Sequence, residues 1–238
     1  MGRAYEVRKA SIQKTGAAKA KLYSNYAKEI YLAAKKGTPE IESNVLLKRL
    51  VDKAKKEQVP SDIINRAIDK AKGAGGEEYE VVTYEGFGPG ASTLIIRTLT
   101  DNVNRTVGMV RAAFNKIHKG LGVTNSVSYN YDYLAIVSVK DMNEEEVFNA
   151  LLENGIEPVE FENEDGEIII TVKPTDHNKV KDVLESIHSD VHYELDEEGM
   201  YAKDKVTLEG EDLELFERLL SLLEDIDDVS DIYHNVNL

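Results

Sequence analysis

The sequences LAIVSV at residues 134–139 and EIIITV at residues 167–172 are two short runs rich in β-branched residues. Runs of this kind predict buried β-strands. Around them, the spacing of apolar residues predicts further elements in the order strand, helix, strand, strand, helix, strand. The predicted strands cover residues 134–139, 157–162, 167–172 and 191–195, and the predicted helices cover residues 144–153 and 176–187. This βαββαβ order is typical of a ferredoxin-like unit.

The first third of the chain has the spacing of amphipathic helices, with apolar residues recurring every three or four positions. The predicted helices cover residues 17–36, a segment from Ser43 or Asn44 to the residue before Pro60, and residues 61–72, the last with Ser61 as its N-cap. These helices are short and joined by turns, which favours a small bundle. Residues 1–16 precede the bundle as a basic arm.

Between the bundle and the ferredoxin-like unit, the pattern predicts strands at 80–84 and 93–99, a helix that begins near Asn104, and a strand at 126–131. After the unit come a predicted helix at 211–224 and a strand at 232–236. A lone strand needs a sheet, so the tail is expected to return to the sheet of residues 77–131.

The predicted fold is therefore α+β with three domains, an N-terminal helical bundle and two α+β domains. The third domain is ferredoxin-like and is inserted in the second. The predicted boundaries are 1–76 for the arm and bundle, 77–133 with 205–238 for the discontinuous domain, and 134–204 for the inserted domain.

Charge is distributed unevenly along the chain. Residues 1–75 hold 17 Lys and Arg against 8 Asp and Glu, whereas residues 129–238 hold 7 against 31, within a formal net charge of −15. A polyanion would be attracted to the first third and repelled by the last. An alternative explanation is that these surfaces keep the domains soluble or face each other across a domain contact.

Two polar groups are candidates for contact with a partner. Phosphate contact needs flexible cations near an exposed aromatic residue. The arm and the first helix supply both, in Arg3, Arg8, Lys9, Lys14, Lys19, Lys21 and Lys28, with Tyr5 among them. The second group lies at a strand-to-helix junction and includes Asn102, Asn104 and Arg105. The favoured interpretation of this second group is that it caps the helix and orders the turn.

Motifs that carry catalysis or hold a cofactor are missing from the sequence. No Cys is present, and no P-loop or GxSxG motif occurs. Of the five His residues, His188 and His192 are four positions apart, but the strand expected from residue 191 puts them on different elements and no HExxH motif accompanies them. The glycine-rich segment at 86–90 is followed by an extended run rather than a helix, so it predicts a structural hairpin; replacing Gly88 by Ala is expected to cost stability if Gly88 has a positive φ. We predict a non-enzymatic protein without a metal, cofactor or small-molecule substrate.

The sequence also lacks an apolar run of the ~20 residues that span a bilayer, and no secretory signal opens it, so a cytoplasmic location without membrane contact is expected. The ferredoxin-like unit is not expected to stack RNA bases. The strands taken as its centre, 157–162 and 167–172, carry Phe161 as their only aromatic residue and lie in the acidic part.

Several stretches resemble the YebC/PmpR family, in particular its YeeN-type branch, from one end of the chain to the other. The stretches are EIYLAA at 29–34, Val59 and Pro60 followed by Ile64, Arg66, Ala67 and Ile68, YEGFGPG at 84–90, LTDNVNRT at 99–106, residues 122–127, and YHNV at 233–236. The resemblance implies three domains, with the third inserted in the second. Relatives commonly carry a Trp where this chain has Tyr5, which weakens a stacking role for the arm.

The resemblance implies two functions, because family members are described as DNA-binding transcriptional regulators or as translation factors. The translation factors include a mitochondrial translational activator and ribosome-associated proteins that relieve stalling at proline-rich stretches. The first hypothesis is therefore a regulator that binds DNA through its basic third, and the second is a translation factor that binds ribosomal RNA with the same surface. The third hypothesis is an acidic scaffold that recruits a basic protein partner.

Overall fold

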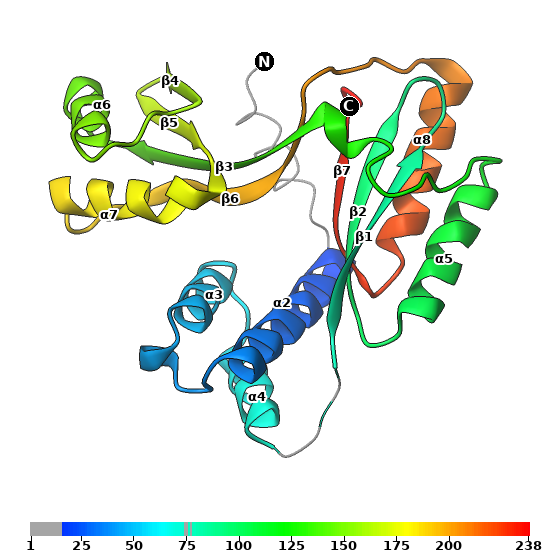
Figure 1. Cartoon of the computed structure of the whole chain (residues 1–238), viewed down its shortest axis with the longest axis horizontal. Helices are drawn as coiled ribbons and strands as arrows, with labels where there is room; N and C mark the ends of the chain where they lie inside the picture. The colour runs from blue at the N-terminus through cyan, green and yellow to red at the C-terminus, as the bar shows by residue number, and fades with distance from the viewer. Residues whose placement is uncertain (1–15, 74–75, 77) are drawn as a thin grey trace. The chain divides into compact units, whose positions relative to one another are not determined.

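The computed structural model describes residues 16–73, 76 and 78–238, drawn in colour in Figure 1. The described chain divides into two compact units. One contains residues 128–205 and is called the insert domain here. The other contains the described residues between 16 and 127 together with 206–238, and is called the composite unit.

The composite unit begins with a helical bundle formed by α2 (Gly16–Lys36), α3 (Val45–Lys56) and α4 (Ser61–Lys72), with a 3₁₀ turn at Ile41–Ser43. Its core contains Ile30, Leu47 and Ile64. The predicted helices are confirmed, but the predicted cap of the third is wrong. Pro60 occupies the N-cap position, because its carbonyl accepts the first helical hydrogen bonds, from the amides of Ile63 and Ile64.

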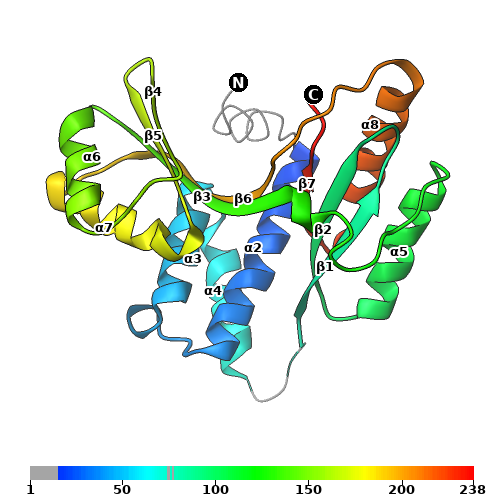
Figure 2. The ribbon, with the colours of Figure 1, turned by 45° about the horizontal axis from the view of Figure 1, so that its top comes forward.

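The rest of the composite unit is a sheet with two helices on one face. Strands β1 (Glu80–Phe87), β2 (Thr93–Thr100) and β7 (Val229–His234) pair antiparallel in the order β1-β2-β7. Helices α5 (Val103–Asn115) and α8 (Gly210–Glu224) lie beside the sheet in Figure 2 and share a core with it, in which Phe114 and Phe216 are fully buried. The C-terminal tail therefore returns to this sheet, as predicted.

Helix α2 is fixed to the other face of the same sheet. Leu94 and Ile96 of β2 belong to the core under α5 and α8, so Arg97 points to the opposite face. There the Arg97 Nη1 lies 3.3 Å from Glu29 Oε1 of α2 and 2.9 Å from Asp231 Oδ2 of β7. This bridge ties the bundle to two strands of the sheet.

The insert domain has the predicted ferredoxin-like order. Its elements are β3 (Tyr131–Lys140), α6 (Glu144–Glu153), β4 (Glu160–Glu164), β5 (Glu167–Val172), α7 (His177–Ile187) and β6 (Tyr193–Ala202), with 3₁₀ turns at Ser128–Asn130 and Pro174–Asp176. The strands pair antiparallel in the order β4-β5-β3-β6. Apolar residues of both helices and of β3 and β5 form its core.

Two strand predictions are wrong in detail. The predicted strand at 126–131 is absent from the described chain, and β3 begins only at Tyr131, because the Glu85 carboxylate binds the backbone amides of Asn125 and Val127 at 2.8 and 2.7 Å. The strand predicted at 157–162 begins at Glu160 instead. It also lies at the edge of the sheet rather than at the centre.

Candidate nucleic-acid interface

The described bundle is the basic part of the molecule. Residues 16–72 contain 13 Lys and Arg against 7 Asp and Glu. Many of these cations lie in the last turn of a helix, namely Lys35 and Lys36 of α2, Lys53, Lys55 and Lys56 of α3, and Lys70 and Lys72 of α4. Cations at a helix C-terminus stabilise the helix through its dipole, so a structural role accounts for part of this pattern.

The C-terminal ends of α2 and α4 lie together. The Lys35 ammonium donates to the carbonyl of Gly73 at 3.2 Å, and the Lys70 ammonium lies 5.5 Å from the centre of the Tyr31 ring. This brings together Lys35, Lys36, Lys70 and Lys72, all exposed, which we call the basic end of the bundle. This group was not predicted from the sequence, although lysines in the last turns of two predicted helices indicate it.

The structure places only part of the predicted binding set. Arg3, Tyr5, Arg8, Lys9 and Lys14 lie outside the described residues. Lys19 is exposed near the start of α2, as a phosphate contact would require.

Lys21 and Lys28, on the same helix as Lys19, bind within the chain instead. The Lys21 ammonium donates to the carbonyl of Glu224, and burial lowers the pKa of Lys21 against the opposing effect of nearby carboxylates. The Lys28 ammonium donates to the carbonyl of Asp227 at 3.1 Å and to Asp228 Oδ1 at 3.2 Å, and its side chain is 14% exposed. The position of Lys28 does not support its predicted contact with a nucleic acid.

The strand-to-helix junction at the end of β2 is held by Asp228, a buried carboxylate. Asp228 Oδ2 accepts hydrogen bonds from Thr106 Oγ1 and Arg105 Nη2, both at 2.8 Å, and from Thr100 Oγ1 at 3.1 Å. Arg105 also pairs with Asp101 at 2.7 Å. Burial alone would raise the pKa of Asp228, but the hydrogen bonds from Arg105, Thr106 and Lys28 outweigh it and lower the pKa to about 2.

The asparagines of the junction differ in their roles. The Asn102 side chain accepts from the amide of Arg105 at 3.0 Å and so caps α5. Asn104 is the second residue of α5 and is exposed. Arg105 braces the junction through Asp101 and Asp228, in line with the favoured interpretation, although Asn102, Asn104 and Arg105 are all exposed.

The glycine-rich segment is a hairpin turn, as predicted. The amide of Gly88 donates to the carbonyl of Ser92 at 2.9 Å, and Ser92 Oγ donates to the carbonyl of Pro89 at 2.6 Å. Gly90, with φ +57°, is the residue of the turn that needs the left-handed conformation. These hydrogen bonds within the turn support a structural role.

Two further findings concern metal sites and membrane-spanning helices in the described chain. Its side chains include no group of His, Asp and Glu that could hold a metal ion. None of its helices is both long enough and apolar enough to span a bilayer.

Comparison with known proteins decides the family. Residues 3–74 match the N-terminal domain of TACO1/YebC proteins, and residues 79–236 match the TACO1/YebC second and third domain. The chain belongs to the TACO1/YebC family. The resemblance inferred from the sequence is thus confirmed.

Relatives of this TACO1/YebC chain match it over its length. It is 45% identical to a probable transcriptional regulatory protein of Chromohalobacter salexigens, over 100% of this chain and 99% of the relative. It is 48% identical to a protein of the same name from Acholeplasma laidlawii, over 99% of this chain and 98% of the relative. The crystal structure of the conserved hypothetical protein Aq1575 from Aquifex aeolicus is similar with a TM-score of 0.75 at 31% identity, over 93% of this chain and 91% of that one. These names support a regulatory role.

Proposed function

We propose that this TACO1/YebC chain is a non-catalytic regulator of transcription that binds DNA in the cytoplasm through its N-terminal bundle. The segregation of charge by domain carries the proposal. The bundle has 13 basic and 7 acidic residues over 16–72, whereas the insert domain, residues 128–205, has 6 and 21. Since phosphate contacts dominate affinity for DNA, a polyanion is attracted to the bundle and repelled by the insert domain. The names of the relatives support the regulatory part.

The proposed surface consists of Lys19 near the start of α2 and the basic end of the bundle, whose lysines are all exposed. Lys28 is left out because its side chain is only 14% exposed, whereas Lys72 stays exposed although it pairs with Asp69 at 2.9 Å. Arg3, Arg8, Lys9 and Lys14 of the preceding segment add four positive charges in sequence.

A second candidate function is binding to ribosomal RNA as a translation factor, and one observation favours it. In a helix-turn-helix, α4 would be the helix that reads bases. Its Arg66 pairs with Asp62 at 3.2 Å and its Lys72 pairs with Asp69 at 2.9 Å, so two of its three cations are engaged by acids on the helix itself. Binding through phosphates alone suits RNA as well as DNA.

The test is a titration of labelled nucleic acid with the full chain, followed by fluorescence anisotropy. Duplex DNA and a folded ribosomal RNA fragment are compared at the same salt concentration. The variant Lys36→Ala is matched with Lys173→Ala, which removes an exposed lysine from the insert domain. We expect the DNA to bind and Lys36→Ala alone to weaken it. Tighter binding of the RNA would favour the translation function, and no binding of either would contradict both.

A further inference from the structure

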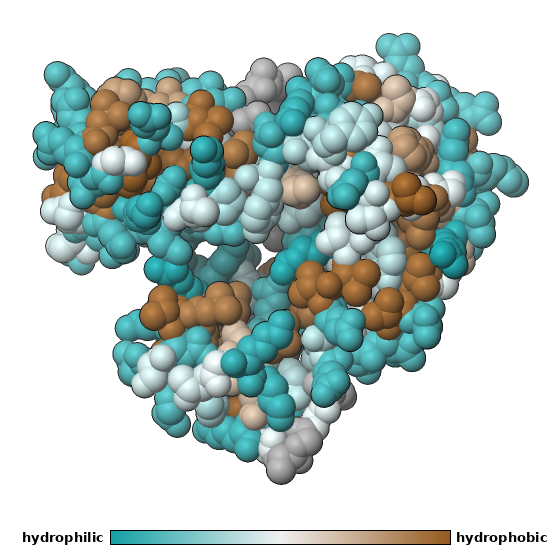
Figure 3. Space-filling view, in the orientation of Figure 1, coloured by the Kyte–Doolittle hydropathy of each residue, from teal (hydrophilic) through white to brown (hydrophobic). Residues whose placement is uncertain are grey.

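Helix α6 and the segment leading into β4 present apolar side chains at the surface of the insert domain. Phe148 and Leu152, one turn apart on α6, are 37% and 45% exposed, and Val159 is 46% exposed. Phe161 of β4 meets Phe148 edge to face, with 5.0 Å between the ring centres. We call Phe148, Leu152, Val159 and Phe161 the apolar strip. Figure 3 shows hydrophobic surface over this part of the domain, and gathered apolar groups of this kind mark interaction sites.

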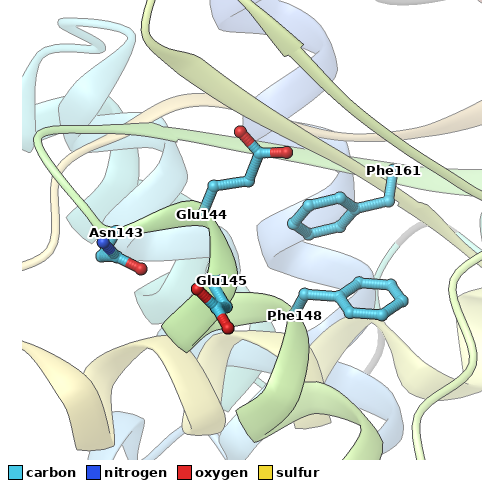
Figure 4. Close-up of a pocket in the computed structure, with 5 residues that line it drawn as sticks. All are labelled: Asn143, Glu144, Glu145, Phe148 and Phe161. Atoms are coloured by element: carbon cyan, nitrogen blue, oxygen red, sulfur yellow. The ribbon is translucent and has the colours of Figure 1, made fainter.

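The two rings line an open pocket with a carboxylate rim. The pocket has a volume of about 490 Å³ and its other walls are Asn143, Glu144 and Glu145 (Figure 4). The aromatic floor gives an apolar side chain a surface to pack on, and the carboxylates at the rim favour a positively charged segment over an acidic one.

Strand β4 is an edge of the sheet, paired among the described strands with β5. The outer side of an edge strand presents backbone N–H and C=O groups to any strand that is added. Side chains alternate along it, so Val159 and Phe161 face α6 while Glu160, Glu162 and Glu164 face the other way. An added strand would therefore meet apolar groups on one face and carboxylates on the other.

Charge decides which occupant fits this edge. Two copies of β4 would place Glu160, Glu162 and Glu164 against like charges, which disfavours self-pairing. The 21 acids of residues 128–205 repel nucleic acid. A charged edge strand protects a sheet from aggregation, but that role gives no reason for the apolar strip beside it.

We propose that β4 and the apolar strip bind an extended segment of another protein in which lysine or arginine alternates with apolar residues. The segment adds to the sheet as a strand along β4. Its apolar side chains lie on the strip, and its cations lie beside Glu160, Glu162 and Glu164. This inference does not depend on nucleic-acid binding by the bundle, and it uses a different domain.

The probe is a fluorescent peptide of about ten residues that alternates lysine and valine, long enough to pair with the whole edge. The full chain is titrated against it, against a glutamate and valine peptide, and against a lysine and valine peptide with N-methylated amides on the pairing side. We expect saturable binding of the first and none of the second. Methylation should weaken binding about tenfold, the loss expected when ladder hydrogen bonds are blocked. Equal affinity for the methylated peptide would overturn strand addition, and binding of the glutamate peptide would overturn the role of charge.

Variants locate the site. Glu162→Lys on β4 is matched with Asp190→Lys, on the loop before β6 at the opposite edge of the sheet; both residues are exposed. We expect about a fivefold loss of affinity for Glu162→Lys, as for a surface ion pair, and no change for Asp190→Lys. Phe148→Ala should also weaken binding of the lysine and valine peptide. If Phe148→Ala fails to fold, Leu152→Ser tests the apolar strip in its place, with the same expected loss. Equal losses in the two charge reversals, or none in Phe148→Ala and Leu152→Ser, would overturn the proposal.

Discussion

The Lys28 ammonium on α2 lies 3.2 Å from Oδ1 of Asp228, a residue 200 positions further along the chain. The two side chains are 14% and 7% exposed. The other oxygen of the same carboxylate accepts from Thr100 at the end of β2 and from Arg105 and Thr106 in the first turn of α5. One buried acid therefore joins the bundle, the β2-to-α5 junction and the segment before β7.

Removing this acid should destabilise the composite unit. We expect Asp228→Ala to lower the free energy of unfolding by about 3 kcal/mol, because it leaves the buried Lys28 ammonium without its ion-pair partner and removes the carboxylate that Thr100 and Thr106 share. Urea unfolding at neutral pH measures the effect. Asp227→Ala is the matched control, since its side chain is exposed and only its backbone carbonyl binds Lys28. Similar losses in the two variants would contradict the central role of Asp228.

Gly88 should not tolerate a side chain. A Cβ at this position would clash with Ser92 Oγ and lie 3.1 Å from Leu94 Cδ1. The sequence-based expectation depended on a positive φ at Gly88; Gly90 has the positive φ instead, so the cost at Gly88 is steric. We expect Gly88→Ala to lower stability in thermal unfolding by about 1–3 kcal/mol, and Ser92→Ala in the same chain to restore part of it.

Gly108 provides the control for that variant. It lies within α5, and a Cβ there would meet nothing within 4 Å. Gly108→Ala should therefore leave stability unchanged or raise it, by up to about 1 kcal/mol, since alanine favours helix. A loss in Gly108→Ala as large as in Gly88→Ala would show that the cost does not come from the tight turn.

His177 should make the insert domain less stable at high pH. Its Nδ1 lies 2.6 Å from Glu198 Oε1 and its Nε2 lies 2.7 Å from Asp196 Oδ1, and only the protonated ring can donate to both. Burial would lower the pKa of His177, but the hydrogen bonds to Asp196 and Glu198 raise it above its usual value.

The direction of the pH effect follows from linkage. A pKa raised in the folded state gives stability that is complete below the unfolded value of about 6.5 and is lost as the pH rises through the folded value. We expect hydrogen exchange of β6 amides to speed up over that range relative to a His177→Gln variant, which has no such dependence. His192→Gln, at an exposed histidine of the same domain, is the control. Parallel profiles for the wild type and His177→Gln would contradict the prediction.

Helices and strands whose apolar residues repeat regularly could be predicted from the sequence. Contacts between residues that are distant in the sequence could not. The helix predicted at 144–153 is α6, Glu144–Glu153, because three acids in the first turn and a regular apolar face define it locally. In the sequence, Asp228 belongs to an acidic run with Glu224, Asp225 and Asp227, a pattern that indicates a solvated helix end. Asp228 becomes buried because β7 pairs with β2, which brings Asp228, the residue just before β7, next to Arg105. Sequence likewise could not separate Lys19 from Lys28, since both are lysines on one helix.

The difference between Lys19 and Lys28 should appear in the salt dependence of binding to duplex DNA. Each cation that neutralises a phosphate contributes about 0.9 to the slope of log K against log salt concentration. Lys19 is exposed, so Lys19→Ala should flatten the slope by about this amount and weaken all sequences alike. Lys28 is held by Asp228, so Lys28→Ala should leave the slope unchanged and lower the free energy of unfolding instead. The two variants remove the same charge from the same helix, so each controls for the other. Anisotropy titrations of the full chain at several salt concentrations measure the slopes. An equal flattening in both variants would show that Lys28 leaves Asp228 to bind the nucleic acid, and a wild-type slope near zero would contradict phosphate binding by the bundle.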